Sequence, residues 1–140
     1  MSEREARRAA ALLETYRGQI DALAKQHEVM HTSLEDVLRA RETLSRYRAA
    51  GEGKELLVPV GATTYVFAQS QTPDRVLVGI GSSLIIEDTE AGARARLDAR
   101  AQSLETAVQT LEARLEEIEA KAEAQGQILD EIVAREKPPG

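Results

Sequence analysis

The stretch that decides the fold is Leu56-Leu57-Val58-Pro59-Val60-Gly61, followed further along the chain by Arg75-Val76-Leu77-Val78-Gly79-Ile80. Each run is rich in β-branched and aliphatic residues and is bounded by glycine or turn residues, which is typical of a short strand. Residues 63–68 and 84–86 have the same character, and the polar sequence 71–74 between the pairs indicates a turn. These runs predict four short strands arranged as two β-hairpins.

The predicted strands are apolar on both faces. Four short strands cannot cover both of their own faces, so we expect partner subunits to cover the rest and this segment to be an oligomerisation module. The alternative is a monomer whose strands fold back onto the helix ends, which would leave much apolar strand edge exposed. The residues that we expect to form the subunit contacts are Val58, Val60, Val66, Val76, Val78, Ile80, Leu84 and Ile86.

Long helices are predicted on both sides of the strands. From Ala6 to Leu44, and again from Leu97 to Ile132, apolar positions recur at steps of three and four without a slip. This spacing is typical of the narrow seam of a coiled coil, whereas ordinary amphipathic helices drift and end sooner. Two helices of similar length joined by a compact middle segment can pair antiparallel. The predicted fold is therefore α+β, a long antiparallel two-helix coiled coil with two central β-hairpins, with boundaries at 1–50, 51–88 and 89–140.

The predicted helix ends carry their own signals. Gly51 and Gly53 suit the left-handed turn that ends the first helix. Thr89 is a candidate N-cap of the second helix, and Glu90 suits the positive end of the helix dipole. Pro138-Pro139 is expected to close the second helix.

Composition and charge exclude several classes of protein. The net charge is −6 and no basic patch stands out, so nucleic acid is not an expected partner. No apolar run reaches the roughly 18 residues that a membrane helix requires, and we expect no signal peptide. The chain lacks cysteine, which excludes a disulfide framework and a thiolate metal site. We therefore expect a cytoplasmic protein without membrane contact.

One stretch matches a catalytic motif, and we reject the match. The run from His27 to His31 has the H-E-x-x-H spacing of zinc proteases, in which two histidines on one helix face bind zinc. His27 lies on the predicted seam, no further histidine follows, and the facing helix offers only Glu112 as a third ligand. A straight paired helix also has no cleft for a substrate. We expect no catalysis, no metal and no cofactor, and interpret His27 as a polar seam residue that helps fix register, like Arg41 and Gln125.

With these features the sequence resembles the prefoldin α family of archaeal type. The most specific stretches are 57–61, 76–81 and the strand 84–87, with long helices on both sides, and two hairpins rather than one indicate the α type. The resemblance covers nearly the whole chain. It implies a hexamer of two α and four β subunits, in which the hairpins form a double β-barrel body from which coiled coils project. It also implies an ATP-independent chaperone that binds non-native proteins and passes them to a group II chaperonin.

Near the free ends of the predicted helices, extra apolar residues lie beside the seam. Apolar side chains that face water there can bind the exposed apolar groups of an unfolded protein. Gly18 and Gly126 lie close by and lower helix stability by about 1 kcal/mol each relative to alanine, so they either loosen the tip or are tolerated surface residues. The simpler explanation of the extra residues is better packing where helices fray. The residues that we expect to bind substrate are Ala9, Leu12, Leu13, Ile128, Leu129, Ile132 and Val133.

Two functions from different classes fit these features. The first is a holding chaperone, and the second is a structural coiled-coil scaffold that spaces partner proteins. A scaffold predicts polar, well-capped tips, whereas a chaperone predicts exposed apolar tips. Leu12, Ile128 and Val133 favour the chaperone.

Overall fold

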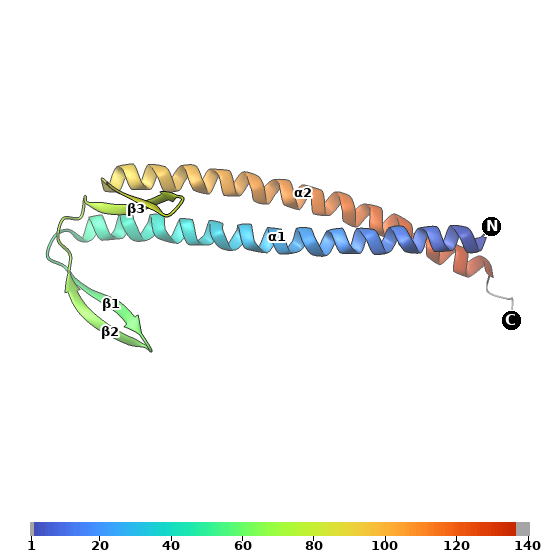
Figure 1. Cartoon of the computed structure of the whole chain (residues 1–140), viewed down its shortest axis with the longest axis horizontal. Coiled ribbons are helices and arrows are strands. Elements are labelled where there is room, and N and C mark those ends of the chain that lie inside the picture. The colour runs from blue at the N-terminus through green and yellow to red at the C-terminus, as the bar shows by residue number, and fades with distance from the viewer. Residues whose placement is uncertain (1, 137–140) are drawn as a thin grey trace. The chain divides into compact units, whose positions relative to one another are not determined.

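The computed structural model describes residues 2–136 of the chain. The predicted fold class, two long helices with two central antiparallel hairpins, is confirmed. The end of the second helix expected at Pro138-Pro139 lies outside the described residues. The elements are helix α1 (Ser2–Ala50), strands β1 (Glu55–Gly61), β2 (Thr64–Gln69), β3 (Val76–Gly81) and β4 (Leu84–Asp88), and helix α2 (Glu90–Glu136) (Figure 1).

The chain divides into two compact units. One holds α1 up to Thr32 together with α2 from Leu104, and the other is Ser33–Ser103, which contains the four strands and the helix ends that adjoin them. Within the first unit the helices run antiparallel. His27 on α1 forms a hydrogen bond with Glu112 on α2, with 2.9 Å between Nε2 and Oε1.

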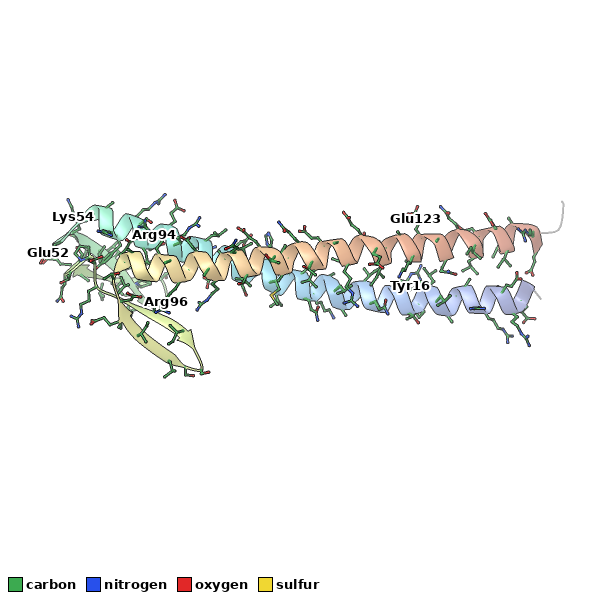
Figure 2. The ribbon with its side chains drawn as sticks, turned by 90° about the horizontal axis from the view of Figure 1, so that it is seen from above. Tyr16, Glu52, Lys54, Arg94, Arg96 and Glu123 are labelled. Atoms are coloured by element: carbon green, nitrogen blue, oxygen red, sulfur yellow. The ribbon has the colours of Figure 1, made fainter. Side chains whose placement is uncertain are left out.

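The predicted seam is the covered stripe of both helices. On α2 every seam residue from Leu97 to Ile132 is buried or half-buried, because the apolar positions of the 3–4 repeat face the other helix. Figure 2 shows this in the first unit, where half-buried Tyr16 lies between α1 and α2 and exposed Glu123 lies on the outer side of α2. The seam accounts for helices that are far longer than the usual three or four turns.

Arg41 is the exception on α1. All other seam residues of α1 from Ala6 to Leu44 are buried or half-buried, but Arg41 is exposed. Its guanidinium reaches Asp98 on α2, with 2.9 Å between Nη1 and Oδ1. An exposed ion pair contributes only about 0–1 kcal/mol, so the apolar stripe, rather than this pair, supplies most of the stabilisation.

The two hairpins share one backbone design. Each is a separate two-stranded antiparallel sheet with a register shift just before its turn. The shift lies between Pro59 and Gly61 in the first hairpin and between Gly79 and Gly81 in the second. These glycines have φ of 113° and 106°, which L side chains rarely adopt. The turns that follow, Ala62-Thr63 and Ser82-Ser83, also have positive φ at both residues, as in a type I′ turn.

Helix α2 begins at a cap that the sequence predicts correctly. Thr89 is the N-cap, since its Oγ1 accepts a hydrogen bond of 3.0 Å from the Gly92 backbone N–H. The preceding residue, Asp88, accepts the Thr89 N–H at 2.7 Å and the Nε–H of Arg96 at 3.2 Å. The backbone hydrogen bond, with help from Arg96, holds the pKa of Asp88 below its ordinary value.

Glu90 ties three segments of the Ser33–Ser103 unit together. Its carboxylate is completely buried. Oε2 accepts a 3.0 Å hydrogen bond from Arg48 and forms an ion pair with Arg94 at 3.5 Å. Its backbone N–H donates to Asp74 in the β2–β3 linker at 3.2 Å. The hydrogen bond to Glu90, with the charge of Asp74, raises the pKa of Arg48 above its ordinary value. The cluster joins the end of α1, the linker and the start of α2.

The hairpin turns provide a first testable prediction. Ser82 and Ser83 are held at φ of 51° and 62°, and the left-handed conformation costs an L residue about 1–2 kcal/mol. Replacing the pair with Asn-Gly, the residues that a type I′ turn prefers, should stabilise the second hairpin by about 1 kcal/mol or more and slow hydrogen exchange of the β3 and β4 amides.

The matched control for this prediction is a pair of alanine substitutions. Gly81→Ala should accelerate the same exchange, because an added Cβ is strained at φ of 106°. Gly79→Ala should have little effect, since its φ is ordinary and the nearest atom to an added Cβ is 4.0 Å away. Exchange that is unaffected by Gly81→Ala, or that is not slowed by Asn-Gly, would contradict the assigned turn.

Candidate functional site

Most of the exposed large apolar side chains in the described residues lie on the strands. Apolar side chains usually occur singly on the surface of a monomer, whereas contiguous groups mark sites of interaction. Here both hairpins carry them in consecutive positions. The large apolar residues of the strands that are exposed are Leu57, Val58, Val60, Tyr65, Val66, Phe67, Leu77, Ile80, Leu84 and Ile85.

The first hairpin is apolar on both of its faces. Residues directly opposite each other in an antiparallel pair share a face, and successive residues alternate. Leu57 pairs with Phe67 on one face, and Val58 pairs with Val66 on the other. All four are exposed, and Phe67 is 75% exposed. Neither face is therefore covered by this chain.

The second hairpin is held against the helices on one side. Val78 on β3 is 9% exposed and shares a groove with Leu44 of α1 and with Ala93 and Leu97 of α2. The guanidinium of Arg100 on α2 donates a 2.9 Å hydrogen bond to the carbonyl oxygen of Gly79. The opposite face stays open, since Leu77 is 74% exposed.

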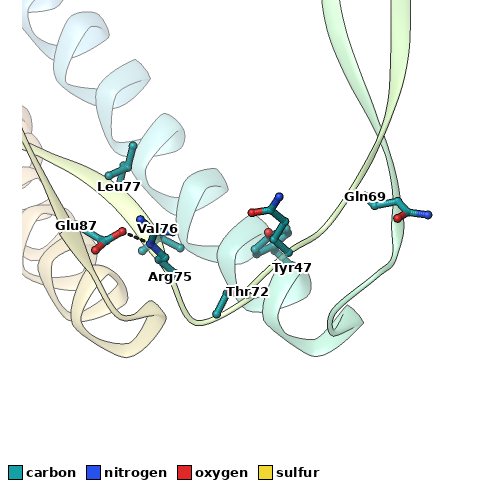
Figure 3. Close-up of a pocket in the computed structure, with 8 residues that line it drawn as sticks. Tyr47, Gln69, Thr72, Arg75, Val76, Leu77 and Glu87 are labelled. Atoms are coloured by element: carbon teal, nitrogen blue, oxygen red, sulfur yellow. Dashed lines mark hydrogen bonds and ion pairs between the residues drawn. The ribbon is translucent and has the colours of Figure 1, made fainter.

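The two hairpins consequently differ in how the chain holds them. In Figure 1, β3 lies along the helices of the Ser33–Ser103 unit, and β1 and β2 project away from them. Between the hairpins lies an open hollow, lined in part by Tyr47, Gln69 and Thr72 and by the ion pair between Arg75 and Glu87 (Figure 3). This hollow is polar and open to solvent, which is unlike the concave, mostly apolar sites that bind small molecules.

The residues predicted to form subunit contacts fall into two groups. The partly covered group lies in the second hairpin, where Val76 and Ile86 are half-buried and Val78 is buried against the chain's own helices. The structure leaves the other five exposed, and these are Val58, Val60, Val66, Ile80 and Leu84. Assignment of all eight residues to a subunit interface stays a prediction.

The most exposed strand residues are missing from that predicted set. Leu57, Phe67, Leu77 and Ile85 lie on the faces opposite to Val58, Val66, Val78 and Ile86, in the cross-strand registers of the two hairpins. The signal that could have found them is the period-two alternation of a strand, which assigns neighbouring residues to opposite faces. Because both faces are apolar, both sets belong to the candidate surface.

A second candidate surface lies at the free ends of the helices, in the unit formed by α1 up to Thr32 and α2 from Leu104. Leu12 of α1 and Ile128 of α2 line a shallow hollow there, with Glu5 and Arg8 at its rim. Ile128 is 44% exposed and Val133 is 52% exposed. The antiparallel pairing thus brings apolar groups from distant parts of the sequence to one place.

The predicted substrate-binding residues divide into seam residues and outward-facing residues. Ala9 and Ile132 are buried in the seam, and Leu13 and Leu129 are half-buried seam residues. Leu12 is half-buried beside the seam, while Ile128 and Val133 are each about half exposed. The outward-facing three can contact another protein without opening the helix pair. A role in binding substrate stays a prediction for all seven.

The H-E-x-x-H stretch lies on the paired helices. His27 hydrogen-bonds Glu112 across the seam, and the rings of His27 and His31 are stacked with 6.0 Å between their centroids. In the part of the chain that the structure describes, no group of three or more His, Cys, Asp or Glu side chains is arranged to hold a metal ion. Within residues 2–136, neither helix has an apolar stretch long enough to cross a membrane.

Two long antiparallel helices separated in sequence by two apolar β-hairpins define a distinct class of α+β fold. The fold of this class has solved counterparts. A filamentous PFD from Methanocaldococcus jannaschii has a TM-score of 0.71 and 26% sequence identity, covering 81% of this chain and 94% of that one. The prefoldin beta subunit from Thermococcus strain KS-1 has a TM-score of 0.61 over 96% of this chain and 94% of its own, and at 18% identity it supports the fold alone.

The sequence comparisons give the family. The model of the prefoldin subunit family matches residues 16–135. A prefoldin subunit alpha of Methanosarcina mazei is 31% identical over 103 residues, covering 71% of this chain and 72% of the relative. A relative from Aquifex aeolicus is 36% identical over 103 residues, covering 69% of each chain. The chain belongs to the prefoldin family and is of the alpha-subunit type, and this membership supports the role of a chaperone subunit.

The histidine pair provides a prediction about metal. We expect the wild-type protein, His27→Ala and His31→Ala to take up the same background amount of zinc, since the described residues contain no group of three His, Cys, Asp or Glu side chains arranged to hold a metal ion. The measurement is zinc content after dialysis, together with titration calorimetry. Stoichiometric zinc in the wild type that is lost in His31→Ala would contradict the rejection of the motif.

Proposed function

We propose that this chain is a subunit of an ATP-independent holding chaperone of the cytoplasm. It assembles through its hairpins with prefoldin beta subunits into a hexamer of two alpha and four beta subunits whose joined strands form a β-barrel body. Its helix ends bind non-native proteins, which pass to a group II chaperonin. The observation that carries the proposal is exposed apolar surface at two places in a member of the prefoldin family, on the hairpins and at the helix ends.

The hairpin surface supports the assembly step. Burying an aliphatic side chain contributes about 1.5–3 kcal/mol, and several such residues lie side by side on each hairpin. The strands of each hairpin also have unpaired outer edges in the described residues, because each sheet contains only two strands. Edges of this kind pair readily with strands of another chain. Joining hairpins from several subunits would satisfy the edges and cover the apolar faces together.

The helix ends support the binding of non-native proteins. Contacts between Ile128 or Val133 and an unfolded chain would each be weak, because the side chain would be covered only in part. Several helix pairs in one assembly would raise the effective concentration, so weak contacts become useful binding. Such contacts consume no nucleotide. A scaffold that only spaces its partners predicts polar, well-capped ends, so exposed apolar residues there favour the chaperone, although a scaffold that binds a folded partner helix would need similar groups.

The assembly step is tested with charged substitutions on one face of the first hairpin. Leu57→Asp with Phe67→Asp places two carboxylates on directly opposite positions of β1 and β2. Because burial of an unpaired charge is costly, assembly with a prefoldin beta subunit should weaken by at least about a hundredfold in sedimentation velocity experiments.

The matched control for assembly is Val29→Asp. Val29 is also a large apolar residue, 63% exposed, but it lies on α1 in the other unit. This variant should assemble like the wild type. A Leu57→Asp/Phe67→Asp chain that forms particles of wild-type mass would refute assembly through this hairpin.

The binding step is tested at the helix ends. Changing Leu12, Ile128 and Val133 together to serine removes the outward-facing apolar groups and leaves the seam intact. In the complete complex we expect assembly to persist while protection of a denatured model protein from aggregation, followed by light scattering, falls. The loss should be partial, since the other subunits also carry helix ends.

Val29→Ser serves as the control for binding, because it removes an exposed apolar side chain elsewhere on α1. It should protect the model protein as well as the wild type does. Equal protection by the triple variant and the wild type would show that this chain's helix ends do not bind the client.

A further inference from the structure

Ser70 is a buried residue at the junction between α1 and the first hairpin. Ser70 directly follows β2 and is only 3% exposed. Opposite it lies Lys54, which directly precedes β1. Figure 1 shows β1 and β2 projecting away from the helices of this unit, so the contacts at this junction matter for how the hairpin is held.

The hydroxyl of Ser70 bridges the helix end and the hairpin base. It donates a 2.7 Å hydrogen bond to the carbonyl oxygen of Gly51, the residue directly after α1. It also accepts a 2.9 Å hydrogen bond from the backbone N–H of Lys54. A hydroxyl can donate one hydrogen bond and accept two, and the Ser70 hydroxyl acts here as both donor and acceptor.

The backbone of Ser70 makes a separate set of contacts. Its N–H donates to the Lys54 carbonyl at 2.9 Å, and its own carbonyl accepts from the Gly53 N–H at 2.8 Å. These bonds extend the pairing of β1 and β2 by one step. They keep the two strands together, whereas the hydroxyl is the group that reaches back to Gly51 and the end of the helix.

The connection between α1 and the first hairpin contains two glycines with positive φ. Gly51 and Gly53 have φ of 81° and 76°, and an added Cβ at either position would meet nothing within 4 Å. Glycines of this kind allow many backbone conformations. Figure 3 shows the chain leaving the first hairpin at Gln69 and passing the end of α1 near Thr72. A glycine-rich connection held by the Ser70 hydroxyl explains how a hairpin that projects away from the helices can have a defined direction.

We propose that Ser70 is a positioning residue for assembly, whose hydroxyl sets the direction in which the first hairpin leaves α1. This inference rests on the proposed assembly through the hairpins. Strands that join must align at about 4.8 Å from one another, and a small change of angle at the base becomes a large displacement at the turn. Removing the hydroxyl leaves the strand pair intact but loosens its direction.

The direction of the hairpin is measured in the isolated chain by pulsed electron paramagnetic resonance. The sequence has no cysteine, so Ala49→Cys on α1 and Val60→Cys on β1 give two unique spin-label positions. We expect a narrow distance distribution in the otherwise wild-type chain and a clearly broader one with Ser70→Ala. Thr72→Ala, which removes a hydroxyl without a hydrogen-bond partner in residues 2–136, should stay narrow.

Ser70→Thr tests whether the hydroxyl itself is responsible. It keeps the donor and the acceptor, so we expect it to restore the narrow distribution. An unchanged distribution in Ser70→Ala overturns the proposal. Broadening by both Ser70→Ala and Ser70→Thr also overturns it, since the fit of the side chain rather than its hydroxyl would then set the direction.

The consequence for assembly is measured with the unlabelled chain and a prefoldin beta subunit. Ser70→Ala should weaken assembly about tenfold in sedimentation experiments, while circular dichroism shows unchanged helix content and melting, and Thr72→Ala should behave as the wild type. A broadened distribution with unaltered assembly would overturn the positioning role. If the wild-type chain itself fails to assemble, the proposed function is wrong. The spin-label result then still shows whether the Ser70 hydroxyl sets the direction of the first hairpin.

Discussion

A two-stranded sheet that is apolar on both faces needs a partner on each face, and the rest of this chain depends on that constraint. Leu57 and Phe67 occupy one face of the first hairpin, and Val58 and Val66 occupy the other. Within residues 2–136 the apolar seam of each helix is used in the helix pair, and these strand residues stay exposed. Covering several large apolar side chains contributes many kcal/mol, so the hairpins drive association in a way that the exposed ion pairs of the helices cannot.

The structure meets this constraint differently in the two hairpins. The second is attached to its own helices by Val78 and by the hydrogen bond from Arg100 to Gly79, and only one of its faces stays open. The first projects away from the helices of its unit, and the Ser70 hydroxyl ties its base to Gly51 at the end of α1. The buried carboxylate of Glu90 fixes the common junction of helices and linker. The second hairpin is thus fixed on one face and the first at its base. Both expose apolar strands, while the point at which each leaves the helices is fixed.

Much of the fold could be predicted from local patterns. The uninterrupted 3–4 spacing identified the helix pair and its buried stripe, since apolar residues on a coiled-coil seam are covered whatever the rest of the chain does. Glycine and turn residues between β-branched runs identified both hairpins, and Thr89 was identified as an N-cap because its position before a long periodic segment is typical of one. All of these signals act between residues close in sequence.

What could not be predicted depends on contacts between distant segments. Nothing local to Val78 distinguishes it from Val58, yet one is covered by the chain's own helices and the other is not. Glu90 looked like a residue suited to a helix dipole, and its burial against Arg48 follows only from the path of the strands between them. Ser70 lies in an ordinary polar linker sequence, and its role depends on Gly51.

The measurement that tests the central claim most directly is hydroxyl-radical footprinting of side chains, in the chain alone at low concentration and in complex with a prefoldin beta subunit. It reports side-chain exposure residue by residue. The account predicts that Leu57, Phe67 and Leu77 are oxidised rapidly in the isolated chain and become strongly protected in the complex, while Val29 is oxidised equally in both. Strand residues that are oxidised as fast in the complex as in the isolated chain would show that partner subunits leave these faces uncovered, and would contradict the account.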